Sequence, residues 1–313
     1  MKIVILDAKT LGDLKELEQL NKFGEVTVYQ YTKSDEVSDR VGDAEIIITN
    51  KVIINKNVLD QAKNLKLICV AATGTNNINM VYAEEKGVAV MNVKGYSTDG
   101  VAQHTFALIL HILNHINLYD PYVKNKSYSA SNIFTHHAWP INELASMKLG
   151  IVGFGAIGQK VAEVAKAFGA EVIYYSTTGN NTNSKFKKVA LEELLSTSDI
   201  VSIHAPMNET TANLISYKEL KKMKPTSILI NTGRGGIVNE RDLAKALDED
   251  LIRAAALDVF EKEPLPEDNP LLLIRNRDRL ITTPHVAWAG VESRKRLIEG
   301  ICVNIERFLG GVK

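Results

Sequence analysis

The sequence predicts an α/β protein with two Rossmann-like domains, each built on a parallel sheet. Two observations lead to this fold class. Short apolar runs alternate with helical patterns in two separate series, and one of these runs leads into a glycine-rich turn. Such runs are typical of strands buried on both faces of a parallel sheet. The 313 residues are enough for two domains of ordinary size.

The first series covers residues 2–97. A leucine at every third position from Leu11 to Leu20 predicts a helix between its first two strands. The expected strands are 3–6, 26–29, 45–49, 67–70 and 88–91.

The second series runs from about residue 149 to residue 283. Its expected strands are 149–153, 171–175, 200–203, 227–231, 254–257 and 280–282. An amphipathic helix over about 292–309 follows, and we expect it to return to the first domain. The predicted domains are therefore 1–97 with 286–313, and 98–285.

A long helix over about 98–119 and a polar excursion over 121–147 separate the two series. Pro121 and Pro140 lie in the excursion, which has no clear periodicity. We expect this segment to bury itself in a homodimer.

Composition narrows the possible partners. Lys+Arg and Asp+Glu both number 37, so there is no net field to attract nucleic acid or an anionic membrane. Cys69 and Cys302 lie in apolar surroundings and are expected to be reduced core residues. No Cys/His cluster has metal-ligand spacing, so no metal is expected. The sequence has no predicted leader or membrane span, and we expect a cytoplasmic protein.

The turn after the strand 149–153 is the predicted dinucleotide site. Its glycines form G-x-G-x-x-G between this strand and a helix over 159–168, and another strand follows. The first two glycines let the backbone approach a pyrophosphate, and the third allows close helix packing. Glycines also cluster in ordinary strand-to-helix turns, so the βαβ context carries the assignment. The expected contacts are Gly153, Gly155, Ala156, Ile157 and Gly158.

Three charged side chains, Arg234, Glu263 and His285, each come shortly after a strand of the second series. Since the carboxyl ends of parallel strands face the ligand crevice, we expect them to converge. Each alone is explained as an ordinary turn or loop residue. Together they offer a guanidinium for a carboxylate, a carboxylate for an imidazole, and a histidine that transfers a proton near neutral pH. This set suits the reduction of a 2-oxo acid.

In this order the motifs resemble the D-isomer-specific 2-hydroxyacid dehydrogenase family, which includes glycerate dehydrogenases (hydroxypyruvate reductases) and D-lactate dehydrogenases. The resemblance covers nearly the whole chain and includes the segments 70–77, 95–105 and 202–207. It implies that Arg234 binds the carboxylate and carbonyl oxygens of the substrate. It also implies that His285 donates and accepts the proton, while Glu263 orients His285 and stabilises its protonated form.

The resemblance also implies contacts with the cofactor and the substrate. The further cofactor residues are Val101, His204, Pro206, Thr232, Gly233 and Asp258. Among them, Asp258 would contact the nicotinamide carboxamide and Val101 would pack on the ring. Ala72, Thr73 and Gly74 resemble a loop whose backbone N–H groups bind the substrate carboxylate, although a plain turn is the alternative.

Ser176 departs from the pattern of NAD-preferring sites, which usually have Asp or Glu at the end of the second strand to hold the ribose 2′-OH. Residues 177–184 contain no acid that would repel a 2′-phosphate and no arginine that would grip one. Lys185, Lys187 and Lys188 could approach the phosphate, although lysines in a polar loop are commonly solvated. The expected cofactor is NAD(H), NADP(H) or both.

Together with this resemblance, the sequence predicts an NAD(P)-dependent oxidoreductase that interconverts a small D-2-hydroxy acid and its 2-oxo acid in a cleft between the domains. Glycerate and hydroxypyruvate, or glyoxylate, are favoured, and D-lactate or a branched 2-hydroxy acid is the alternative. A nicotinamide-sensing protein that resembles corepressors is the alternative from another class. Formate dehydrogenase chemistry suits the three charged residues less well.

Overall fold

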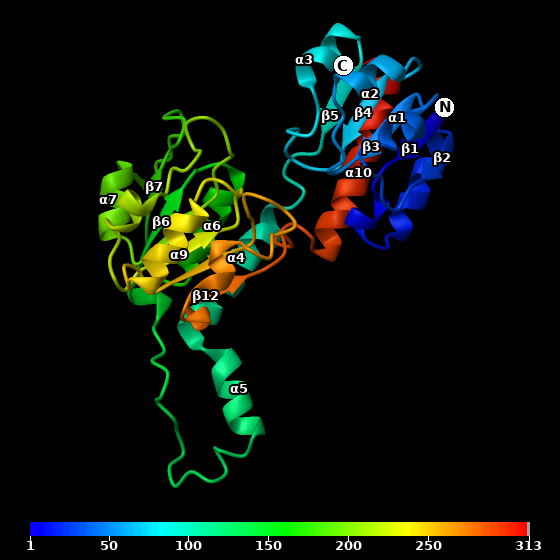
Figure 1. The fold of residues 1–313 in the computed structure, drawn as a ribbon. Coiled ribbons are helices and arrows are strands. Elements are labelled where there is room, and N and C mark those ends of the chain that lie inside the picture. The colour runs from blue at the N-terminus through cyan, green and yellow to red at the C-terminus, as the bar shows by residue number, and fades with distance from the viewer. Residues whose placement is uncertain (312–313) are drawn as a thin grey trace. The chain divides into compact units, whose positions relative to one another are not determined.

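The computed structural model describes residues 1–311 and confirms the predicted α/β class with two parallel sheets. The chain divides into two compact units (Figure 1). The first unit is Met1–Ser97 together with the chain from Trp288 onward, and the second unit is Thr98–Ala287. The second junction lies two residues beyond the predicted position 286. Each unit contains one of the sheets.

The first unit has a five-stranded sheet in the order β2-β1-β3-β4-β5, with a core on each face. Residues of its first strand alternate between the faces: Ile3 and Ile5 pack in one core and Val4 in the other. Helix α10 (Val291–Leu309) packs its apolar side into the first of these cores. The last long helix thus returns to the sheet with which the chain begins.

The elements of this unit before α10 follow the predicted alternation. The strands are β1 (Lys2–Ile5), β2 (Glu25–Val28), β3 (Ile46–Thr49), β4 (Leu67–Val70) and β5 (Ala89–Asn92). The α-helices are α1 (Val37–Val41), α2 (Lys56–Gln61) and α3 (Met80–Glu85).

The helix predicted from the leucine spacing takes another form. Two 3-10 helices, η1 (Ala8–Leu11) and η2 (Lys15–Phe23), stand in its place. Gly12 between them has φ of +73°, a left-handed conformation that ends a helix. The regularly spaced leucines therefore belong to two short 3-10 helices and the turn between them.

The second unit has a seven-stranded sheet in the order β12-β11-β10-β9-β6-β7-β8. The order reverses at β6, because β7 and β8 continue on one side and β9 to β12 on the other. In open α/β sheets, ligands bind outside the carboxyl ends of the strands at such a reversal. The glycine turn after β6 and His204 after β9 both lie there.

The elements of the second unit are as follows. The strands are β6 (Lys148–Val152), β7 (Glu171–Tyr175), β8 (Lys187–Lys188), β9 (Ile200–Ile203), β10 (Ile228–Asn231), β11 (Ala254–Leu257) and β12 (Leu280–Thr282). The α-helices are α4 (Thr98–Asn114), α5 (Ile116–Lys124), α6 (Ala156–Ala167), α7 (Leu191–Thr197), α8 (Tyr217–Leu220) and α9 (Glu240–Asp248). Three short 3-10 helices are η3 (Leu144–Ser146), η4 (Pro270–Leu273) and η5 (Arg277–Arg279).

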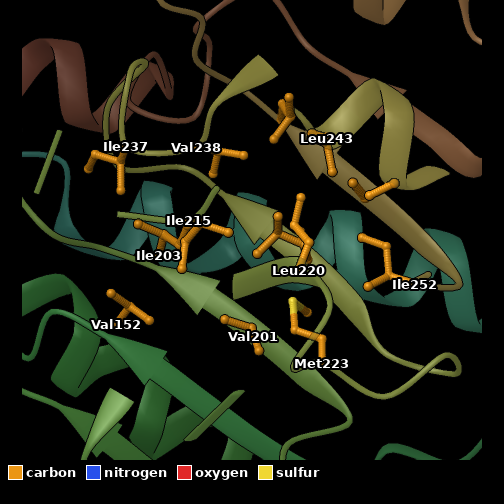
Figure 2. Packing of buried hydrophobic residues seen from close by; sticks show 14 of the residues in the cluster. Val152, Val201, Ile203, Ile215, Leu220, Met223, Ile237, Val238, Leu243 and Ile252 are labelled. Carbon is orange, nitrogen blue, oxygen red and sulfur yellow. The ribbon is translucent and has the colours of Figure 1, made fainter. Parts of the chain in front are cut away.

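Buried side chains cover both faces of this sheet. Figure 2 shows one of these cores, which includes Val152, Val201 and Ile203 of the strands together with Ile215 and Leu243. Because protein interiors are closely packed, such strands hold the residues at their carboxyl ends in defined positions.

The prediction of one helix over 98–119 is wrong, because the helix breaks at His115. This residue joins α4 to α5 with φ of +51°, and its Nε2 lies 3.3 Å from a guanidinium nitrogen of Arg253. Helix α5 then continues through Pro121 to Lys124, so the predicted excursion begins in a helix.

Residues 116–143, which we call the arm, project from the rest of the second unit (Figure 1). An aromatic cluster joins its two ends: the rings of Tyr122 and His136 stack 4.0 Å apart, and the Tyr119 hydroxyl donates to the Trp139 carbonyl at 2.6 Å. Several large apolar side chains of the arm are exposed, namely Ile116, Val123, Tyr128, Ile133, Phe134 and Ile141. The arm therefore has an ordered base and an exposed apolar surface.

Two further predictions concern the chain as a whole. Cys69 and Cys302 are free and buried, as expected for core residues. Within residues 1–311, no helix combines the length and the apolar character that a membrane span requires.

Candidate active site

The glycine turn after β6 is closely packed at two of its glycines and open at the third. Gly153 has φ of +90°, and a Cβ there would lie 2.6 Å from the Ala205 nitrogen. A Cβ on Gly158 would collide with the Gly153 carbonyl, so α6 packs directly against the turn. By contrast, apart from its own chain neighbours, no atom of the described residues crowds the Cβ position at Gly155, which caps the 12-residue α6. The N-terminus of α6 thus faces open space, where its dipole and N–H groups favour an anion.

A pocket of about 790 Å³ lies at the end of β7. Ser176 lines it and is largely buried, with its Oγ 3.3 Å from the Asn181 nitrogen. Lys188 also lines the pocket and donates to the Gly179 carbonyl at 2.7 Å. Of the three lysines considered from the sequence, only Lys188 lines this pocket among the described residues. The pocket lies at the carboxyl end of β7, the edge of an open α/β sheet where ligands bind.

His204, at the reversal of strand order, has a hydroxyl group beside each of its two ring nitrogens. Its Nδ1 lies 3.4 Å from Thr232 Oγ1, and its Nε2 lies 2.8 Å from Ser202 Oγ. Thr232 Oγ1 lies 3.0 Å from Thr105 Oγ1, which donates to the Val101 carbonyl at 2.8 Å. Burial lowers the pKa of His204 to about 3, so its ring is neutral near pH 7. This chain links His204, Thr232 and Val101, which are all predicted cofactor residues.

The turn that carries Arg234 is fixed from both sides. The Asn231 side chain accepts from Gly233 N and donates to the Arg234 carbonyl, both at 3.0 Å. Gly235 packs so closely on the Phe260 carbonyl that a Cβ would collide with it. The Arg234 turn therefore lies directly against the segment that leads to Glu263.

Glu263 and His285 form a direct pair. Glu263 Oε2 lies 2.7 Å from His285 Nδ1, while Oε1 accepts from Phe260 N at 3.0 Å. The His285 and Glu263 side chains are 22% and 32% exposed, so the pair is accessible to a small molecule. Because Nδ1 faces the carboxylate, Nε2 is the ring atom placed for proton exchange.

Asp258 holds the turn that carries His285. Its side chain is only 1% exposed, and its oxygens accept from Val286 N and Ala287 N, each at 2.9 Å. The Asp258 carbonyl also accepts from His285 N at 2.8 Å. This supporting role was not predicted from the sequence, where the only available signal is the position of Asp258 directly after β11. Its contact with the nicotinamide carboxamide stays a prediction.

The predicted substrate loop lies in the first unit, directly after β4. Ala72 and Gly74 are half-buried, and Thr73 is exposed. Thr73 Oγ1 donates to the Val93 carbonyl at 3.4 Å, which ties the loop to the end of β5. The structure thus places Arg234, Glu263 and His285 in one unit and the loop in the other.

Comparison with known proteins identifies the family. Residues 106–287 match the model of the NAD binding domain of D-isomer specific 2-hydroxyacid dehydrogenases. The chain belongs to this family. It is 37% identical to a hydroxypyruvate reductase of Blautia hydrogenotrophica, covering 99% of this chain and 98% of that protein. It is 35% identical to a glycerate dehydrogenase of Methylorubrum extorquens, covering 99% and 96%.

Solved structures agree with this assignment. An acyclic imino acid reductase, Bsp5, in complex with NADPH and D-Arg is 29% identical and has a TM-score of 0.88, covering 99% of this chain and 98% of that one. A D-lactate dehydrogenase of Aquifex aeolicus with NAD and lactic acid is 25% identical and has a TM-score of 0.84, covering 100% and 96%. The protein is therefore an NAD-dependent oxidoreductase of 2-hydroxy acids. The names of its relatives favour this function over that of a nicotinamide-sensing protein.

Proposed function

We propose that this dehydrogenase interconverts hydroxypyruvate and D-glycerate, with glyoxylate as a second substrate. The observation that carries the chemistry is the Glu263–His285 pair, 2.7 Å between Oε2 and Nδ1. The choice of substrate rests on relatives that are named hydroxypyruvate reductase, glycerate dehydrogenase and glyoxylate reductase.

In this proposal each charged residue has one task. Arg234 binds the carboxylate and the keto oxygen of the substrate, since a guanidinium fork can hold two oxygens. The bound nicotinamide supplies the hydride that reaches the keto carbon. His285 donates its Nε2 proton to the keto oxygen as negative charge develops there, and Glu263 stabilises the imidazolium beforehand. In the oxidation of glycerate, His285 takes the hydroxyl proton back.

The predicted substrate loop supplies the remaining contact in this proposal. In it, the backbone N–H groups of Ala72, Thr73 and Gly74 bind the substrate carboxylate. This assignment is supported by the position of the loop at the carboxyl end of β4, where parallel sheets carry their ligand-binding residues. Several N–H donors on one carboxylate would hold the keto carbon in one orientation for the hydride.

The proposed cofactor contacts follow from the same sheet edge. Gly153, Gly155, Ala156, Ile157 and Gly158 would hold the pyrophosphate, as the open N-terminus of α6 supports. The residues that would contact the nicotinamide half are Val101, His204, Pro206, Thr232, Gly233 and Asp258.

We infer that Ser176 lets the enzyme use NADPH as well as NADH. No carboxylate stands at the end of β7, and Lys188 lies in the same pocket, where it would attract a 2′-phosphate. Glu193 also lines the pocket, but Lys187 pairs with it at 2.7 Å and offsets its charge. Replacing Ser176 with Asp should raise the KM for NADPH at least tenfold and leave that for NADH within about threefold. Equal effects on both cofactors in initial-rate assays would contradict this inference.

The arm supports a homodimer as the working form. Phe134 is 90% exposed and Ile133 is 61% exposed, which is costly for large apolar side chains unless another surface covers them. A second copy of the chain would provide that surface. Sedimentation equilibrium should give twice the monomer mass, and replacing both Ile133 and Phe134 with Asp should shift the protein toward the monomer. A monomeric wild-type protein at micromolar concentration would overturn this proposal.

The substrate proposal is tested by initial rates of NADH oxidation with hydroxypyruvate, glyoxylate, pyruvate and 2-oxoisocaproate. We expect the largest kcat/KM with hydroxypyruvate, and the same rate after treatment with EDTA because the chemistry uses no metal. A preference for pyruvate or 2-oxoisocaproate would instead favour a D-lactate or branched 2-hydroxyacid dehydrogenase. A cytoplasmic location also stays a prediction from the sequence.

A further inference from the structure

A second histidine faces a carboxylate in the second unit, through a threonine. The Thr283 hydroxyl donates to Asp258 Oδ1 at 2.6 Å. His104 Nε2, from α4, lies 3.0 Å from the same hydroxyl and 3.6 Å from Asp258 Oδ1. Among the described residues, His104 is the one ion-pairing group within 4.0 Å of the Asp258 carboxylate.

The direction of these hydrogen bonds follows from the groups involved. An ionised carboxylate only accepts, so the single hydroxyl proton of Thr283 points to Asp258. Thr283 Oγ1 can then only accept from His104, and Nε2 of His104 must carry a proton. The chain of donors therefore runs from α4 through Thr283 to the carboxylate.

This chain ends on the turn of the candidate proton donor. Asp258 accepts from Val286 N and Ala287 N, and its carbonyl accepts from His285 N. His285 has φ of +54°, a conformation that costs a residue with a Cβ about 1 kcal/mol and persists only where neighbours hold it. The turn thus depends on a carboxylate that is itself oriented by Thr283 and His104.

We propose that His104 is a positioning residue for the reaction. Through Thr283 it fixes the Asp258 carboxylate, and through that carboxylate it fixes the backbone on which His285 stands. The inference rests on the proposed role of His285, because only then does the position of this turn limit the rate. A misplacement of about 1 Å in a reacting group is enough to cost much of the rate.

Three variants separate this role from ordinary packing. His104→Leu removes the donor, His104→Gln keeps an N–H donor at a similar reach, and His111→Leu makes the same change at another half-buried histidine of α4. We expect His104→Leu to lower kcat for 2-oxo acid reduction about tenfold, which corresponds to about 1.4 kcal/mol. The KM values and the dissociation constant of NADH should stay within twofold. His104→Gln and His111→Leu should stay within threefold of wild-type kcat.

A double-mutant cycle with Thr283→Val tests the path. If His104 acts through Thr283, the double variant with His104→Leu loses no more kcat than Thr283→Val alone. If the loss of kcat in the double variant equals the product of the two single losses, His104 does not act through Thr283. A wild-type kcat in His104→Leu would overturn the proposal, as would an equal loss in His104→Gln.

Hydrogen exchange of the Val286 and Ala287 amides gives a readout that does not depend on the substrate. We expect exchange about tenfold faster in His104→Leu than in wild type, and unchanged in His104→Gln and His111→Leu. Unchanged exchange in His104→Leu would overturn the positioning role even if the enzyme turns over. If wild type turned over none of the 2-oxo acids, the proposed function would be overturned. The exchange rates would still show whether His104 holds the turn that carries His285.

Discussion

Asp258 and Glu263 are two carboxylates that hold the same turn in different ways. The Asp258 side chain is 1% exposed and accepts hydrogen bonds from two backbone N–H groups and a hydroxyl. The Glu263 side chain is 32% exposed and faces the imidazole of His285. One carboxylate therefore fixes the backbone and the other meets the ring.

This difference assigns the two carboxylates to different tasks. A buried carboxylate that accepts from backbone donors is held in place, and so supports the structure. A partly exposed carboxylate beside a histidine can respond when the ring gains or loses a proton. We therefore predict that removing the Asp258 charge mainly lowers the stability of the protein, whereas removing the Glu263 charge mainly lowers the rate.

The largest expected effect on stability comes from Asp258→Asn. The amide replaces one acceptor oxygen with a donor, which leaves a buried N–H group of the turn without its partner, at a cost of about 2 kcal/mol in the free energy of unfolding. Glu263→Gln, at an accessible site, should change that free energy by less than about 0.5 kcal/mol. Urea denaturation measures both. Equal losses would remove the distinction between the two carboxylates.

A further prediction concerns the rate in Glu263→Gln. Without the negative charge beside Nδ1, the imidazolium that donates the proton is less stabilised, and kcat for 2-oxo acid reduction should fall about 10- to 100-fold. Stopped-flow measurement of NADH oxidation checks this. A rate within twofold of wild type would show that the Glu263 carboxylate does not assist His285.

A third histidine sharpens the comparison, because within residues 1–311 His204 contacts hydroxyl groups and is paired with no carboxylate. Its pKa is lowered from 6.5 to about 3 by burial, so the unfolded chain binds a proton at acid pH that the folded chain does not bind. Its contribution to stability is complete above pH 6.5 and is lost as the pH falls from there toward 3. Between about pH 7.5 and pH 5 the loss is about 2 kcal/mol.

Urea denaturation at these two pH values tests the sign. The free energy of unfolding of His204→Gln should decrease by about 2 kcal/mol less than that of wild type over the same interval. A parallel decrease in both proteins would contradict the burial of a neutral His204.

The sequence predicted the parts of this site that depend on local patterns. The glycine turn could be recognised because its three glycines stand between a strand and a helix. The positions of Arg234, Glu263 and His285 after strands led to the expectation that they converge, and the contact between Glu263 and His285 follows that expectation.

Other features depend on contacts between distant residues. Asp258 supports the His285 turn through backbone N–H groups of residues 286 and 287, which carry no signal in their side chains. Nothing near His104 in the sequence indicates its contact with Thr283, which lies far away in the chain. The break at His115 likewise coincides with a contact to Arg253, far away in the chain.

The most direct test of the account is the rate of hydroxypyruvate reduction by His285→Gln, with NADH binding measured on the same protein. We predict that kcat falls about 10³-fold, as expected when a general acid is lost, while the dissociation constant of NADH stays within twofold of wild type. A kcat within tenfold of wild type, with NADH still bound, would contradict the claim that the Glu263–His285 pair transfers the proton.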